Sequence, residues 1–373
     1  MFSSPPKGMS QKALDQALCF AVDHADHQSV PWLVAGGANP NQCVNSDRTL
    51  LHQACSSGWS EVAMALVRAG ASTSAFSNGF TPLHNAWSSG KSDLALALMQ
   101  SGHVDLQLRN HDGLNYLHWA VCTKNVDAAR AFIEHGLPVD AVCVSGETAL
   151  MLCAKKERNE CVELLLEKGA NPELTDAKGR TALHLAAGAD RTSPSCYTIT
   201  RRLIAGRANL DAADLQGHTP LHLACYLQNY GSTHLLLAAG AAHKKSNDHT
   251  TPMDLLVTSP MRSMSKNGAS DHRSHCLLMA AHGADTSTLG KDLAGIAPLK
   301  AAALMGLTER AVQLAQSGSP VRLSPRHQSL ATVAMQAGHA ETASVLQAEE
   351  ARQAIEGVLD SSLRMAPKRA DLG

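Results

Sequence analysis

A short pattern of one polar residue, one or two apolar residues and a histidine returns along this chain at nearly constant spacing. Its last position falls at His52, His84, His118, Met151, His184, His222 and Asp254, in steps of 32, 34, 33, 33, 38 and 32 residues. A glycine follows 18 residues later in five of these segments, at Gly70, Gly102, Gly136, Gly169 and Gly240. Two landmarks that keep the same phase indicate a repeated structural unit of about 33 residues.

Each unit predicts two helices followed by a turn. Thr81 can cap the first turn of a helix, and Pro82 then occupies the first helical position, where its missing N–H costs nothing. Six residues after the histidine, Gly58 and its counterpart Gly90 predict a turn into a second helix, such as 61–69. Gly70 and Gly169 are typical of the residue after a helix, where a positive φ is required. Residues 171–179 then predict a projecting β-turn.

The units continue beyond the clear copies of the pattern. A first unit is centred on Cys19, and two degraded units are centred on Lys300 and Ala331, so about ten units extend from Ala13 to Gln347. A single unit cannot bury its own apolar face. Stacking is therefore expected to bury residues such as Leu183 and Ala186 against the neighbouring unit.

The Thr-Pro-Leu-His-x-Ala phrase, the glycine within each unit and the Gly-Ala-Asn/Asp tail resemble the ankyrin repeat. The resemblance is strong from Thr49 to Ala241 and weaker at both ends. It implies an all-α ankyrin-repeat solenoid of about ten helix-turn-helix units with projecting β-turns. It also implies that the histidine of each phrase is buried and bonded to the backbone of the next unit.

The departures from the pattern suggest a domain organisation. We expect a flexible segment at 1–12, the repeat array at 13–349 and a C-terminal helix with a disordered tail at 350–373. Within the array, 49–241 is regular and 250–349 is degraded. Insertions between the two helices of a unit are expected near 188–197 and 259–274. Arg207 replaces the glycine of other units, which predicts strain if the backbone there is left-handed.

Composition narrows the function classes. The net charge of -1 disfavours a nucleic-acid binder, which needs a dense field of Lys and Arg. No stretch is long and apolar enough to span a membrane, so no membrane insertion is expected. The ten cysteines follow no apolar N-terminal segment, which predicts reduced thiols and a cytoplasmic location. Cys55, Cys153 and Cys225 are interpreted as small packing residues.

Candidate chemistry is sparse. The clusters 23–27 and 271–276 combine His with Asp or Cys, but neither has the paired spacing of a structural zinc site. We interpret the first as a solvated turn and the second as the edge of a loop. Phosphate-binding and dinucleotide-binding motifs are absent from the sequence. We therefore expect no catalytic residues, no cofactor and no metal. Trp87 and Trp119 are interpreted as core residues.

By resemblance to the ankyrin family, partners bind the turn tips and the exposed face of each first helix. Positions 9, 7, 6 and 4 before the histidine and 4 and 5 after it give the following candidates: Arg48, Phe80, Arg109, His111, Lys155, Lys156, Lys178, Arg180, His218, Tyr226 and Leu227. Among these, Phe80, Arg109, Arg180 and Tyr226 are the strongest, because interface hot spots favour aromatic residues and arginine. The basic residues between Arg109 and Arg180 predict an acidic segment on the partner.

The sequence thus predicts a non-catalytic, monomeric adaptor that binds another protein. A narrower hypothesis is a bacterial effector acting on a host protein, suggested by the Ala-rich composition and the Ser- and Pro-containing N-terminus. The alternative is an enzyme or metal-dependent regulator that uses the irregular C-terminal third.

Overall fold

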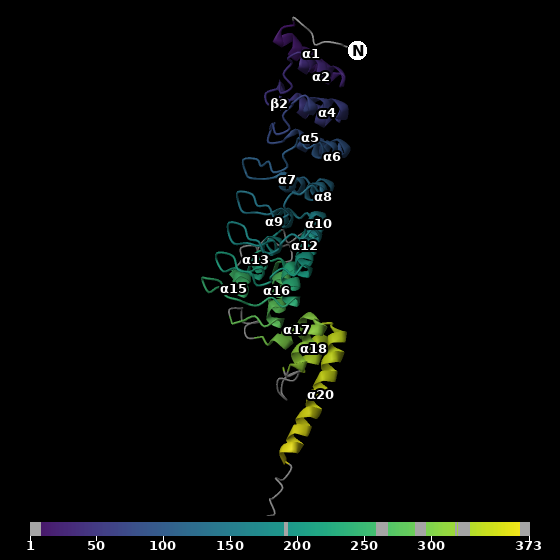
Figure 1. Cartoon of the computed structure of the whole chain (residues 1–373). Coiled ribbons are helices and arrows are strands. Elements are labelled where there is room, and N and C mark those ends of the chain that lie inside the picture. The colour runs from purple at the N-terminus through teal and green to yellow at the C-terminus, as the bar shows by residue number, and fades with distance from the viewer. Residues whose placement is uncertain are drawn as a thin grey trace, which may run out of the picture. The chain divides into compact units, whose positions relative to one another are not determined.

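The computed structural model describes residues 9–189, 193–258, 268–287, 296–317, 319 and 329–365, which form ten successive helix pairs. The chain divides into two compact units, Met1–Ala182 and Leu183–Gly373. In the first unit, Figure 1 shows the pairs stacked in chain order. Its helices are α1 (Gln11–Asp23), α2 (Ser29–Ala35), α3 (Leu50–Ser57), α4 (Ser60–Arg68), α5 (Pro82–Ser88), α6 (Ser92–Gln100), α7 (Tyr116–Cys122), α8 (Val126–Glu134), α9 (Ala149–Lys156) and α10 (Asn159–Glu167).

The division falls within α11 (Ala182–Ala187), and the second unit continues with the remaining helices. These are α12 (Pro194–Ala205), α13 (Pro220–Tyr226), α14 (Tyr230–Ala238), α15 (Pro252–Thr258), α16 (Gly268–Ala281), α17 (Pro298–Met305), α18 (Thr308–Gln316), α19 (Leu330–Gln336) and α20 (Ala340–Met365). This arrangement confirms the predicted all-α solenoid of about ten helical pairs. No helix within the described ranges is long and apolar enough to cross a membrane.

The first helix of a typical pair is fixed by its cap. At α5, the Thr81 hydroxyl accepts a hydrogen bond from the backbone N–H of His84, and the backbone N–H of Thr81 donates to His84 Nδ1 at 3.0 Å. The same reciprocal arrangement begins α3 and α13, while Asn115 replaces threonine before α7. Because each cap satisfies N–H groups that have no partner within the helix, it defines where the helix begins.

The buried histidines also join successive pairs. His52 Nε2 donates to the Phe80 carbonyl at 3.0 Å, and His118 Nε2 donates to that of Glu147 at 3.1 Å. In the second unit, His222 makes the corresponding bond to Thr250 at 3.2 Å. Each bond satisfies a buried ring N–H and a turn carbonyl together, which confirms the structural role implied by the ankyrin resemblance.

The turns between pairs form a row of their own. The first contains two short antiparallel strands, β1 (Cys43–Asn45) and β2 (Arg48–Thr49), with Cys43 opposite Thr49. Later turns bond directly to one another: the Val144 N–H donates to the Asp112 carbonyl, and the Ala177 N–H donates to that of Ser145. The turn tips of the first unit therefore present one connected surface.

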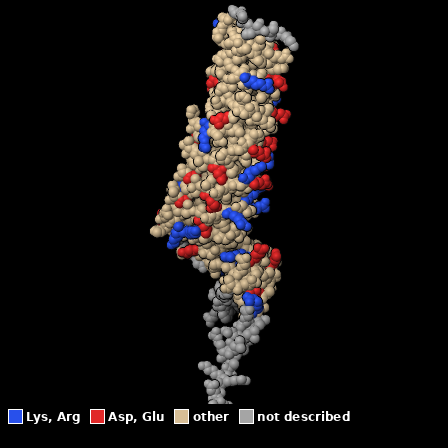
Figure 2. All heavy atoms as spheres, in the orientation of Figure 1, with Lys and Arg blue, Asp and Glu red and all other residues tan. Residues whose placement is uncertain are grey.

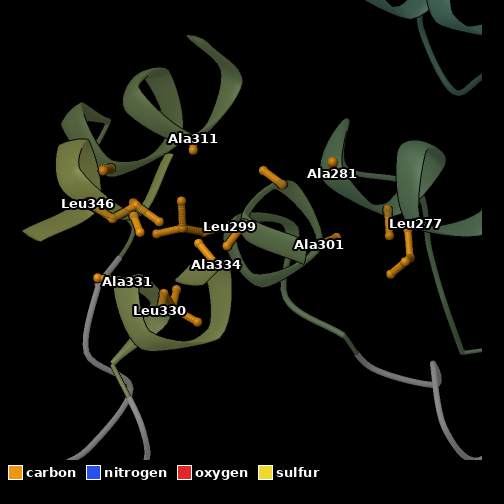
Figure 3. Close-up of a cluster of buried hydrophobic side chains, with 14 residues drawn as sticks. Leu277, Ala281, Leu299, Ala301, Ala311, Leu330, Ala331, Ala334 and Leu346 are labelled. Carbon is orange, nitrogen blue, oxygen red and sulfur yellow. The ribbon is translucent and has the colours of Figure 1, made fainter. Parts of the chain in front are cut away.

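The degraded pairs at the C-terminus still share a core. Leu277, Leu299, Leu330 and Leu346 are buried there among alanines of α16 to α20. Figure 3 shows these leucines with Ala301 and Ala334 between the helices. Alanine at the contact positions lets the helices approach closely. The cap before α17 is Ala297, which makes no side-chain hydrogen bond, as the sequence indicates.

The structure corrects three expectations about the irregular regions. The predicted insertion at 188–197 partly lengthens α12, which begins at Pro194, and residues 190–192 lie outside the described residues. The second part of the predicted insertion at 259–274 is helical, because α16 begins at Gly268. Residues 259–267 lie outside the described residues. The expected separate helix near 350–373 is instead the continuation of α20, which runs unbroken from Ala340 to Met365. The segment 1–8 and the tail 366–373 lie outside the described residues.

Candidate partner-binding surface

A groove of about 310 Å³ opens between the turns of the third and fourth helix pairs, within the first unit. Phe76 and Phe80 are exposed at its edge, at 36% and 42%. Leu108 and Leu114 of the following turn also line it, and Trp119 of α7 contributes a buried wall. Its lining is thus largely apolar and aromatic. On the face of the molecule drawn in Figure 2, Lys and Arg are interspersed among Asp and Glu on a mostly uncharged surface.

The histidine at this junction differs from its counterparts. Its Nδ1 accepts from Thr81, so Nε2 carries the ring proton, yet no hydrogen bond joins His84 Nε2 to any residue that the structure describes. Burial lowers the pKa of His84 to about 3, which keeps the ring neutral. His84 lines the groove. The groove therefore contains a neutral imidazole with an N–H donor that the fold does not use.

Tyr116 is the physical reason for this difference. It occupies the first helical position of α7, where proline stands in α5 and α13. Its ring stacks on that of His84 with centroids 4.4 Å apart, and its hydroxyl lies 2.9 Å from the Thr81 hydroxyl. Trp119 packs edge-on against the same imidazole at 4.9 Å. Aromatic packing thus replaces the usual hydrogen bond between pairs at this junction.

The predicted core role of the two tryptophans is confirmed by burial. Trp87 is 3% exposed and packs edge-on to Phe132, and Trp119 is 8% exposed. The indole nitrogens of both form no hydrogen bond with a described residue. Trp119 also lines the groove, so one residue serves the core and the candidate surface.

Four predicted cationic residues lie at the surface of the first unit: Arg109, Lys155, Lys156 and Lys178. The Arg109 guanidinium donates to the carbonyl of Val142 in the next turn. Lys155 pairs with Glu147 at 2.8 Å and keeps half of its side chain exposed. Burial alone would raise the pKa of Glu147, but hydrogen bonds from Lys155 and Ser145 outweigh it and lower that pKa. His111 is exposed at the tip of the same turn as Arg109.

Arg180 and Arg48 are less available to a partner. Arg180 binds Asp176 through both its backbone and its side chain. Its backbone N–H donates to Asp176 Oδ1, and its Nε and Nη2 lie 2.9 and 2.7 Å from Asp176 Oδ2. Burial opposes ionisation of Asp176, but the bonds from Arg180 and two backbone N–H groups hold its pKa below the usual value. Arg48 donates to the Ser56 hydroxyl at 2.6 Å and is half-buried. Both arginines stabilise the turns that carry them.

Three predicted residues belong to the second unit. Tyr226 is 41% exposed and Leu227 is half-buried at the end of α13. His218 is also half-buried, lies 3.9 Å from the Asp214 carboxylate and supplies the carbonyl that accepts from His184 Nε2.

The candidate residues omitted several exposed apolar side chains on the turns. Val144 is 78% exposed and Leu215 is 72% exposed, both seven residues before the repeating histidine position. Val142 is 43% exposed two residues earlier. The positional rule already covers all three, and they were missed because aromatic and charged residues were favoured over aliphatic ones.

The two candidate metal clusters lie in different environments. Asp23 ends α1, and residues 24–28 form the exposed turn that follows it, as interpreted from the sequence. The interpretation of 271–276 as a loop edge is wrong, because these residues lie within α16. His275 is 2% exposed with Nε2 2.8 Å from the Thr233 hydroxyl, and His272 Nε2 lies 3.6 Å from Cys276 Sγ. No group of three or more metal-binding side chains occurs among the described residues.

The cysteines behave as packing residues. Cys55, Cys153 and Cys225 are buried, and burial raises the pKa of Cys55 to about 12. The same cause raises the pKa of Cys153 and of Cys225. These thiols stay protonated and unreactive, since the thiolate is the nucleophilic form.

Comparison with known proteins agrees with the fold. The family model for ankyrin repeats in three copies matches residues 18–109, 89–176 and 168–248, so the chain belongs to the ankyrin-repeat family. It is 28% identical over 230 residues to the E3 ubiquitin-protein ligase KEG of Arabidopsis thaliana. It is 40% identical over 88 residues to the B-cell lymphoma 3 protein homolog of Mus musculus, and 28% identical over 247 residues to NF-kappa-B inhibitor zeta of Bos taurus.

These matches cover limited parts of the proteins. They include 58%, 23% and 65% of this chain, in the order given, and 12%, 20% and 30% of the respective relatives. The chain therefore spans less than a third of the length of each of these relatives. What it shares with them is the repeat array.

Proposed function

We propose that the chain is a non-catalytic scaffold that binds a partner protein through its turn tips and the exposed faces of its first helices. The observation that carries the proposal is the combination of exposed apolar side chains and cations on one row of turns. Phe80, Val142 and Val144 are all more than a third exposed there, beside Arg109. Clustered apolar residues at a surface are typical of an interaction site.

The names of the relatives support a shared interaction module. One is named as a ubiquitin ligase and another as an inhibitor of NF-kappa-B, and this chain of repeats matches only 12% and 30% of their respective lengths. An array common to proteins with such different names is not tied to one reaction. Fold alone does not determine a function, so the proposal depends on the residues of the turns.

The test is affinity capture with a variant that alters the surface without touching the core. We expect Phe80→Ala combined with Arg109→Ala and Lys156→Ala to abolish capture of the partners retained by the natural chain. Loss of one aromatic hot spot alone commonly costs about 2 kcal/mol or more in binding, roughly a thirtyfold loss of affinity. Captured proteins would be identified by mass spectrometry.

The matched control changes the second helices instead. Glu134 of α8 and Lys168, which follows α10, form an exposed ion pair at 3.2 Å. Replacing both with alanine removes the same kind of surface charge away from the turns. Circular dichroism and thermal melting should be unchanged in both variants. Equal capture by the triple variant and the natural chain would refute the proposed surface.

A role as a bacterial effector and a cytoplasmic location stay predictions of the sequence. Deletion of residues 1–8, which lie before α1 and its cap Ser10, tests the first: export from a bacterial host should fail while the helical content is retained. Export of the shortened chain would contradict the hypothesis.

A further inference from the structure

The groove beside Phe80 offers hydrogen-bond donors that the fold leaves unused. The Trp119 indole N–H is buried and makes no bond within the described residues, and the Nε2–H of His84 has no acceptor among them either. Both side chains are 8% exposed and line the groove. A buried polar group without a partner costs about 1–3 kcal/mol, and this cost applies to the Trp119 indole N–H. An occupant that supplies an acceptor would also engage the Nε2–H of His84, so it gains affinity from this junction.

The size of the groove suits one side chain. Pockets for small molecules span about 300–1,000 Å³, and this one lies at the lower end of that range. Phe76 and Phe80 at its edge and Leu114 in its wall offer apolar contacts. A bulky apolar side chain with its adjoining backbone would fill it, and the backbone carbonyl would provide the acceptor.

Charge indicates what flanks that side chain. On the turns and first-helix ends from Arg109 onward in the first unit, the candidate positions hold five cations and two carboxylates: Arg109, Lys155, Lys156, Lys178 and Arg180 against Asp112 and Glu147. Arg180 is neutralised by Asp176, and Lys155 by Glu147. Arg109, Lys156 and Lys178 remain. Arg109 and Lys156 lie on the side of the groove toward α9, and Lys178 lies in a later turn on the same side. On the opposite side, Asp47 accepts from Ser77 and Asn78.

We propose that the groove binds one bulky apolar side chain of an acidic segment in a partner protein. The acidic residues lie toward Arg109 and Lys156, and a carbonyl oxygen beside the apolar side chain accepts a hydrogen bond from His84 Nε2. This inference rests on the proposed interaction function and specifies the chemistry of the partner. It also gives the binding a direction, because the cations lie on one side of the groove and Asp47 on the other.

The test uses a phage-displayed library of random 16-residue peptides selected against the full chain. We expect enriched peptides to contain one Phe, Tyr, Trp or Leu with Asp or Glu clustered on one side of it. Synthetic copies would be measured by fluorescence anisotropy. Replacing the apolar residue with alanine should weaken binding at least tenfold, and raising the salt concentration should weaken it further.

Two chain variants locate the binding. Phe80→Ala should weaken binding of the enriched peptides at least tenfold. Phe20→Ala is the matched control, because Phe20 is 65% exposed on α1 and lies outside the groove; it should change binding less than twofold. Cys122 lines the groove, so bound peptide should slow its alkylation by N-ethylmaleimide, whereas exposed Cys43 serves as the internal reference.

Nuclear magnetic resonance tests the donors directly. Peptide binding should shift the indole N–H of Trp119 and slow the exchange of the His84 Nε2 proton, while Trp32 and Trp59 are unaffected. Neutral or basic enriched peptides, no enriched peptide, or binding insensitive to Phe80→Ala would each overturn the inference. If the groove inference is overturned but the triple surface variant still loses peptide binding or protein capture, the proposed scaffold function survives. If neither peptide binding nor protein capture depends on Phe80, Arg109 and Lys156, the groove inference and the proposed function both fail.

Discussion

Buried histidines should make the second unit sensitive to acid, and His275 provides the sharpest test. It is 2% exposed on α16, and its environment lowers the pKa to about 3, because burial disfavours the charged ring and His272 lies nearby. In the unfolded chain a histidine titrates near its ordinary value of about 6.5. Unfolding between these two values therefore takes up a proton.

The sign and size follow from proton linkage. The stabilising effect of the neutral ring is fully present above the unfolded pKa and is lost as the pH falls toward the folded pKa. Each pH unit in this window costs about 1.4 kcal/mol per histidine. Between pH 6.5 and 4.5, His275 alone should remove about 2 kcal/mol from the free energy of unfolding of the second unit. A typical domain has about 5–15 kcal/mol, so the loss is large.

The assay is urea unfolding at pH 7.5, 6.5, 5.5 and 4.5, with circular dichroism as the signal that monitors unfolding. His275→Gln removes the titrating ring, so its stability should depend less steeply on pH, by about 1.4 kcal/mol per unit below pH 6.5. The control is His249→Asn: His249 is exposed at φ +66°, a backbone conformation that asparagine tolerates. All four tryptophans belong to the first unit, so their fluorescence should report the same unfolding in both variants. Equal pH slopes in His275→Gln and the natural chain would refute the reasoning.

Further substitutions test other contacts. Gly306→Ala should destabilise the C-terminal pairs by more than about 1–2 kcal/mol, the usual cost of a left-handed residue, because its new Cβ would lie 2.5 Å from His339 Nδ1. Gly338→Ala is the control, since open space surrounds that position, and it should cost no more than this range. Thermal melting compares the two variants. Arg207→Gly should stabilise the chain by about 0.5–1 kcal/mol, since Arg207 has φ +62°; an unchanged melting midpoint would contradict stored strain. Asp176→Ala should cost about 1.5–3 kcal/mol, because it removes charged hydrogen bonds to Arg180 and two backbone N–H groups; a loss below 0.5 kcal/mol in urea unfolding, on the order of a neutral surface change, would count against the bond network.

Much of the fold could be predicted from the sequence because local signals and the repeat period agree. Thr81 and Pro82 begin α5 as expected, and Gly70 and Gly169 have φ of +88° and +83° at the ends of their helices. Arg207 has the left-handed backbone on which the predicted strain depends. Each of these positions is determined by backbone chemistry within a few residues.

The remaining features depend on contacts between distant segments. Residues 268–274 have weak helical preference, yet they form the start of α16. The next residue, His275, contacts Thr233 of α14, which is a contact between distant segments that local preference cannot predict. Gly357 suggests a break in α20 that the structure does not contain. At the candidate site, the positional rule found Phe80 and Arg109. It could not show that Arg180 forms an ion pair with Asp176. It also could not show that Tyr116 stacks on His84, whose Nε2 lacks the bond to a turn carbonyl that other histidines make.

The hydrogen bonds between turns also determine where the chain can change length. Asp47 accepts from the backbone N–H of Asn78, Asp140 from Asn171 and Asp211 from Ala242, each pair 31 residues apart. Extra residues within a turn would shift these donors and acceptors out of register. The turn between α5 and α6 differs, because the backbone N–H groups of Ser89, Gly90 and Lys91 donate to carbonyls of α5 in the same pair. The added residues after α11 lie at the corresponding place in their own pair. We therefore expect that a peptide tag or a small domain grafted between α5 and α6 would leave the row of turns, and partner binding, intact.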